Sequence, residues 1–143
     1  MRRKNFIWLK SEIISGNTSL IIYQIPWKSI RPNNAVNDIV KIRDSIGKAY
    51  IHGSAYGTKM VTEEAYSPYF SKTVLAGNKA YETKGTWQMK NDFMSGPFIN
   101  YTIFDKANRR ILVLEGFCYA PSKEKRDLMF ELESIIKSIQ IKK

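Results

Sequence analysis

The fold of this chain is decided by residues 81–121, which read YETKGTWQMKNDFMSGPFINYTIFDKANRRILVLEGFCYAP. Apolar and polar side chains alternate through residues 81–90, and this period of two is typical of a strand with one buried face. Two further extended segments follow, at 98–105 and 109–119. The short turn between them suits a hairpin, because Asn108 tolerates the left-handed conformation. We therefore predict an antiparallel sheet.

A hairpin and a helix are expected before this stretch. Residues 6–13 and 20–25 are interpreted as two strands joined by a turn, and Pro26 ends the second strand. One of the asparagines at 33–34 is expected to cap a helix that ends near 47–48. The side chains expected to face inward are Val36, Ile39, Val40 and Ile46, and those expected to face water are Asp38, Lys41 and Asp44.

The sequence predicts three more features. Residues 58–63 favour a strand, and residues 65–77 are interpreted as a long irregular connection with a proline and several aromatic residues. A last helix is expected after Pro121, with Glu133 and Lys137 at the favourable i,i+4 spacing. Its apolar stripe consists of Leu128, Leu132, Ile135, Ile136 and Ile139.

These elements predict an α+β fold, with an antiparallel sheet of about five to six strands and two helices packed on it. Each helix has a single apolar stripe, so each is expected to lie on the sheet with its other face in water. The layout resembles the Mog1/PsbP-like group of small α+β domains, and a ferredoxin-like arrangement ranks second. A chain of 143 residues that is 43% hydrophobic can build one core, so residues 1–143 are expected to form a single domain.

Three strings carry a resemblance to a known family: AYETKGTW at 80–87, DFMSGPF at 92–98 and VLEGFCYAP at 113–121. They resemble segments of the Bacteroidetes lipoproteins known only as domain-of-unknown-function 4837, and the likeness covers nearly the whole chain. The resemblance implies a location in the cell envelope or periplasm, and the family has no established activity. Further matches are NFIWL at 5–9, IRDSI at 42–46 and LESII at 132–136.

The start of the chain departs from the family pattern, whose members usually begin with a lipoprotein signal and a further amino-terminal half. Residues 1–4 are basic, but the apolar stretch 5–9 is too short for a signal core and Lys10 interrupts it. The lone cysteine is Cys118, so a lipobox cysteine is absent as well. We therefore expect residues 1–143 to be the carboxyl-terminal module of a longer protein, with a naturally short relative as the alternative.

The composition is strongly basic, with 23 Lys and Arg against 13 Asp and Glu and a formal net charge of +10. Nucleic-acid binding is nevertheless not expected, because the basic residues are scattered through every element and no recognised nucleic-acid motif is present. A basic surface suits contact with anionic lipid or acidic polysaccharide in an envelope protein. No apolar run approaches the roughly 18 residues that cross a bilayer, so no transmembrane segment is expected.

Cofactors, metal sites and catalysis are not expected. A zinc site cannot be built from one cysteine, Cys118, and one histidine, His52. Glu115 shares a strand face with Val113 and Phe117, so we expect a partly buried carboxylate that pairs with a nearby Lys or Arg. No second carboxylate or histidine is placed beside it by the sequence, and no serine has the setting of a nucleophile elbow.

The candidate contact residues lie in two loops. Trp27, Lys28 and Arg31 follow the first hairpin and offer an aromatic and basic group to a partner or a glycan, and the flanking prolines stiffen this loop. Trp27 is equally consistent with a lid on the core. The second candidate is Asp92, whose carboxylate either contacts a ligand or accepts N–H groups of its own turn.

We interpret the chain as a non-enzymatic binding or scaffold module, whose partner is an unknown protein or a component of the envelope. The alternative is a small-ligand-binding domain or an unrecognised enzyme, with a pocket under the connection at 50–77. A deep cavity with convergent polar groups would distinguish the two. The sequence does not predict the ligand or the oligomeric state.

Overall fold

The computed structural model describes residues 2–3, 5–13, 16–52, 57–63, 68–90, 94–119 and 125–142. The strands of this part of the chain are β1 (Arg2–Arg3), β2 (Phe6–Ile13), β3 (Gly16–Pro26), β4 (Lys59–Thr62), β5 (Tyr69–Leu75), β6 (Asn78–Lys90), β7 (Ser95–Asp105) and β8 (Arg110–Tyr119). Its helices are the short 3₁₀ helix η1 (Pro32–Asn34), α1 (Ala35–Tyr50) and α2 (Lys125–Lys137).

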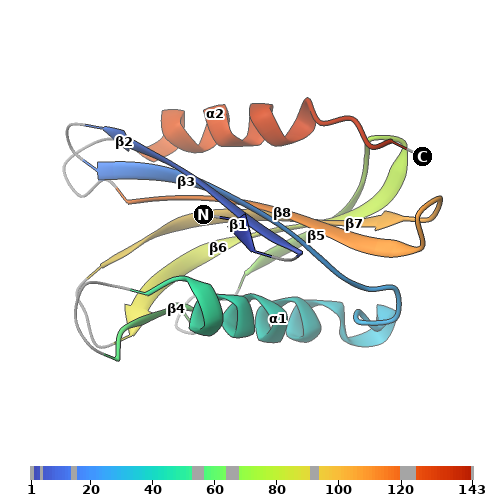
Figure 1. The fold of residues 1–143 in the computed structure, drawn as a ribbon, viewed down its shortest axis with the longest axis horizontal. Coiled ribbons are helices and arrows are strands. Elements are labelled where there is room, and N and C mark those ends of the chain that lie inside the picture. Colours follow the sequence, from blue (N-terminus) through green and yellow to red (C-terminus); the bar gives the residue numbers. More distant parts are fainter. Residues whose placement is uncertain are drawn as a thin grey trace.

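The strands form one eight-stranded sheet in the order β1-β2-β3-β8-β7-β6-β4, with β5 also paired to β6. Every neighbouring pair is antiparallel. The two long helices cover opposite faces of this sheet, α1 below it and α2 above it in the view of Figure 1. The predicted α+β fold with an antiparallel sheet and two packed helices is confirmed.

The central strands β7 and β8 are buried almost throughout because a helix covers each of their faces. Ile111 and Val113 of β8 belong to the core cluster on the α1 side, whereas Leu112 and Leu114 belong to the cluster on the α2 side. The alternation expected of a strand therefore separates two cores rather than a core and water.

Helix α2 packs on the sheet through the predicted apolar stripe. Leu128, Leu132 and Ile136 are buried, whereas Ile135 is 47% exposed and lies at the edge of the stripe. The predicted i,i+4 pair is present, since Lys137 Nζ lies 3.2 Å from Glu133 Oε1.

Glu133 also ties α2 to the sheet. Tyr101 Oη lies 3.2 Å from Glu133 Oε1 and donates to Glu82 Oε2 at 2.6 Å. Burial alone would raise the pKa of the Glu133 carboxyl, but the Lys137 hydrogen bond and the charges of Lys84 and Lys137 lower it. The carboxylate is therefore stabilised in its charged form.

The connection predicted to be irregular contains a strand. Residues 69–75 form β5, which pairs with β6 through a two-residue turn at Ala76 and Gly77. Both turn residues have positive φ, 52° and 78°, as a type I′ hairpin turn requires. The sequence pattern did not predict this strand, because β5 lies at the sheet edge with Tyr69 and Val74 exposed. Alanine is also an unusual first residue for such a turn.

Helix α1 runs to Tyr50, beyond the predicted end near Gly47. This glycine lies against β4: a Cβ placed on Gly47 would lie 2.1 Å from the carbonyl oxygen of Met60. Gly47 therefore permits close packing of α1 on β4 and does not end the helix.

Candidate functional site

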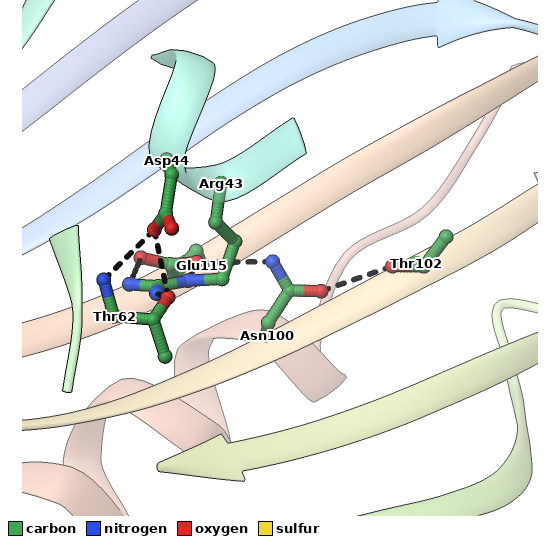
Figure 2. A network of polar contacts seen from close by, with 6 residues as sticks. All are labelled: Arg43, Asp44, Thr62, Asn100, Thr102 and Glu115. Atoms are coloured by element: carbon green, nitrogen blue, oxygen red, sulfur yellow. Dashed lines mark hydrogen bonds and ion pairs between the residues drawn. The ribbon is translucent and has the colours of Figure 1, made fainter. Parts of the chain in front are cut away.

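A buried ion pair lies between α1 and the centre of the sheet. Arg43 Nε and Nη2 donate to Glu115 Oε1 and Oε2 at 2.5 and 2.8 Å (Figure 2). Both side chains are 1% exposed. The two parallel hydrogen bonds give the bidentate geometry that arginine and carboxylate groups favour. The predicted pairing of Glu115 with a basic residue is confirmed.

Further polar side chains from β4, β7 and α1 complete this network. Asn100 Nδ2 donates to Glu115 Oε1 at 3.0 Å, and Thr102 Oγ1 donates to Asn100 Oδ1 at 2.9 Å. Thr62 Oγ1 accepts a short hydrogen bond from Arg43 Nη1 and donates to Asp44 Oδ1 at 2.9 Å. Figure 2 shows these groups converging from α1, β4, β7 and β8.

The electrostatics of the network favour the charged form of Arg43. Burial would lower the pKa of the Arg43 guanidinium, but the Glu115 charge and hydrogen bonds outweigh this effect and raise it. Burial and the Glu115 charge raise the pKa of the Tyr23 hydroxyl far above its usual range. The Arg43 guanidinium also lies 3.5 Å from the centre of the Phe98 ring.

This arrangement holds α1 on the sheet. The carboxylate of Glu115 already accepts three hydrogen bonds, and the cavities described below are lined by other residues. The sequence placed Glu115 correctly but did not identify Arg43. The signal was present, because Arg43 occupies the gap between the inward residues Ile39 and Ile46 at helical spacing.

The predicted contact loop lies partly against the core. The ring of Trp27 is half-buried and meets the Phe104 ring edge-on, with centroids 6.1 Å apart. Lys28 is exposed and makes no ion pair with the residues that the structure describes. Trp27 thus covers the core edge, and Lys28 extends into solvent beside it.

Arg31 fastens this loop to α1. Its Nη2 and Nε donate to the Asp38 carboxylate at 2.9 and 3.1 Å, and its backbone N–H donates to the same group at 2.8 Å. These bonds hold the pKa of Asp38 well below its usual range. The expectation that Asp38 faces water was wrong, because Arg31 covers it and leaves it 7% exposed. The other predicted contact residue, Asp92, lies outside the described residues.

A cavity of 490 Å³ opens at the same end of the sheet. Pro26, which precedes Trp27, pairs with Arg110 across β3 and β8. The segment after α2 is tied to this end, since Asn108 Nδ2 donates to the Lys142 carbonyl oxygen at 2.8 Å. The lining residues are Asn5, Gln24, Ile25, Pro26, Asn108, Arg109, Arg110 and Lys142.

Basic side chains gather at this end, which we call the basic end. It comprises the loop after β3, the β7–β8 hairpin and the segment after α2, which lie together at the right of Figure 1. Its acidic members are engaged: Asp38 pairs with Arg31, and Asp105 with Arg110 at 2.9 Å. Its basic members are Lys28, Arg31, Lys106, Arg109, Arg110 and Lys142.

A second hollowed region runs along α2. Two adjoining hollows of 430 and 240 Å³ share Pro97, Arg126 and Met129, and Phe130 lies beside them with 54% of its surface exposed. The pocket predicted under the connection at 50–77 is not among the described cavities, and residues 53–56 and 64–67 lie outside the described residues.

Within the described ranges, no three His, Cys, Asp or Glu side chains gather closely enough to hold a metal ion. In the same part of the chain, no helix has the length and apolar character needed to cross a membrane.

Comparison with known proteins places the chain in a family. No curated protein sequence matches it. Among solved structures, the protein of unknown function PA94 from Pseudomonas aeruginosa is similar, with 10% sequence identity and a TM-score of 0.56 over 100% of this chain and 87% of that chain. At this identity the likeness shows a shared fold only. The family model named Domain of unknown function (DUF4837) matches residues 1–138, and the chain therefore belongs to the DUF4837 family.

Proposed function

We propose that this domain is a non-enzymatic binding module that docks on an anionic lipid surface of the cell envelope through its basic end. The observation that carries the proposal is the gathering of basic side chains there: Arg31 and Arg110 pair with Asp38 and Asp105, whereas Lys28, Lys106, Arg109 and Lys142 make no ion pair with the described residues. An excess of positive charge in one place attracts an anionic surface more strongly than the same charges spread evenly.

The shape of the basic end supports docking. Arg31 and Asp38 fix the loop to α1, so Lys28 is presented from a stiff segment. The β7–β8 hairpin is fixed in turn by Asp105, which accepts from Arg110 Nε at 2.9 Å and from Asn108 Nδ2 at 2.8 Å. A surface that is ordered before binding loses less conformational entropy on contact.

The family resemblance supports the envelope location. The members that the sequence resembles usually begin with a lipoprotein signal, and a domain held by such an anchor would work beside a membrane whose anionic headgroups attract basic segments. The buried Arg43–Glu115 pair supports a structural role for the most conspicuous carboxylate, because this group is already saturated with hydrogen bonds.

The proposal is tested by sedimentation with phosphatidylcholine vesicles that contain or lack phosphatidylglycerol. Reversing two cations of the basic end, Lys28→Glu with Arg109→Glu, is expected to weaken binding to the anionic vesicles. Each basic residue near such a surface is worth about 1 kcal/mol, so the loss is at least about 30-fold in affinity.

The matched control is Lys41→Glu with Lys48→Glu, which changes the net charge equally on the exposed face of α1. A loss much smaller than that of the basic-end variant supports the proposal. Equal losses in the two variants would contradict it, since they would assign the binding to diffuse net charge.

A further inference from the structure

We infer that the 490 Å³ cavity of the basic end binds the phosphate group of an anionic ligand. This inference rests on the proposed function and adds to it the chemistry of the group that is recognised. The volume lies within the range of about 300–1,000 Å³ that is typical of small-molecule sites. Arg109, Arg110 and Lys142 line the cavity, and no carboxylate is among the described residues of its lining.

The cavity is rich in uncommitted donors. Arg110 uses Nε for Asp105 at 2.9 Å and Nη1 for Gln24 Oε1 at 3.0 Å, and its Nη2 has no hydrogen bond to the described residues. Arg109 and Lys142 make no ion pair within the described part of the chain. The guanidinium of Arg110 is therefore held in place by two partners and retains donors for a third.

The frame around these donors is fixed by hydrogen bonds and by unusual backbone conformations. Asn5 and Arg109 have φ of 64° and 52°, and they are two of the three non-glycine residues with positive φ in the described chain. Such conformations cost on the order of 1 kcal/mol each and persist where surrounding contacts determine them. Gln24 Nε2 donates to Asn5 Oδ1 at 2.6 Å and thereby links the two sides of the frame.

The charge of the lining favours a phosphate monoester over a carboxylate. A phosphate monoester carries close to two negative charges and three acceptor oxygens, which match several cations, whereas a carboxylate carries one charge. Arginine forks suit these oxygens, and lysine adds a point charge. Ile25 and Pro26 form an apolar wall, on which the group that carries the phosphate would lie.

The test uses the full chain and inorganic phosphate as the first probe, with calorimetric titration at an ionic strength kept constant by chloride. The test variant is Arg109→Asn with Lys142→Gln. Asparagine tolerates the left-handed backbone at this position, so the charge is removed without added strain. We expect saturable binding by the wild type and a loss of about tenfold or more in the variant, as is typical of charge-assisted hydrogen bonds.

The matched control, Lys41→Gln with Lys48→Gln, removes the same charge from α1 and is expected to change phosphate affinity by less than about twofold. A second arm replaces free phosphate by vesicles that contain phosphatidic acid. If the test variant weakens free phosphate and weakens vesicles with phosphatidic acid more than vesicles of equal charge with phosphatidylglycerol, the ligand is a lipid phosphate. If it weakens free phosphate alone, the ligand is a soluble phosphate compound, and the assignment of the cavity stands in either case.

The inference is overturned if the wild type shows no saturable phosphate binding, or if the α1 control loses as much affinity as the test variant. If phosphate binding fails in this way but the protein still binds anionic vesicles through Lys28 and Arg109, the proposed function is unaffected. If the wild type binds phosphate saturably but does not bind anionic vesicles, the phosphate site stands and the proposed docking function is wrong.

Discussion

Removing one charge of the buried Arg43–Glu115 pair is expected to destabilise the domain severely. Both side chains are 1% exposed, so Glu115→Met leaves a guanidinium in the core without the carboxylate that pairs with it. Breaking a buried pair in this way costs about 3–5 kcal/mol. For a domain whose total stability lies at about 5–15 kcal/mol, this loss takes away much of the folded population at raised temperature. Arg43→Met is expected to cost a similar amount, because it leaves Glu115 unpaired.

The double variant, Arg43→Met with Glu115→Met, shows how much of each single loss comes from leaving one buried charge unpaired. It removes both charges, and the remaining cost is the orphaned Asn100 Nδ2 donor, about 1–3 kcal/mol. Thr62 keeps its hydrogen bond to Asp44. The double variant is therefore expected to be more stable than either single variant, with a coupling energy of at least about 3 kcal/mol.

Urea unfolding at neutral pH, with linear extrapolation to water, measures all four proteins of this cycle. Thermal unfolding provides a second readout that does not depend on the extrapolation. If each single variant loses less than about 1 kcal/mol, as exposed ion pairs do, the pair does not behave as a buried one and this prediction is wrong.

Three other predictions concern the loop and helix α1. The pKa of Asp38 is lowered, so the ion pair with Arg31 should make wild type more stable than Asp38→Asn by its full amount at neutral pH. This difference should narrow as the pH falls below about 3.9, the pKa of an unfolded aspartate, and melting temperatures followed against pH measure it. Gly47→Ala should lower the free energy of unfolding, measured by urea unfolding, by about 1–3 kcal/mol, because the new Cβ meets the Met60 carbonyl. Alanine has the better helix propensity, so a gain in stability would show that α1 can shift away from β4. Trp27→Ala should lower the melting temperature and Lys28→Ala should not, since only the tryptophan packs on the core; equal effects would contradict this difference.

The central strands and the last helix could be predicted from the sequence, because the spacing of apolar residues along each segment indicates its secondary structure. The alternation through residues 81–90 and the hairpin at 98–119 predicted β6, β7 and β8. The apolar stripe after Pro121 predicted α2. Strand β5 was missed because an edge strand with exposed apolar residues shows no clear face.

The site was harder to predict, because its parts come together only in the fold. Glu115 was expected to find a basic partner, but Arg43 is 72 residues away in the chain. Asp38 was placed in water by helical periodicity, whereas Arg31 from the preceding loop covers it. The basic end joins the loop after β3, the β7–β8 hairpin and Lys142, which the order of strands brings to one end of the sheet. Basic residues scattered along the sequence therefore appeared unrelated.

The most direct test of the docking function is amide resonance mapping of the nitrogen-labelled chain with bicelles that contain phosphatidylglycerol. We expect signals of residues 27–31 and 106–110 to broaden first, while those around Lys41 and Lys48 on α1 are unaffected at the same lipid concentration. Uniform broadening, or broadening that begins on α1 or α2, would contradict the claim that the basic end is the contact surface.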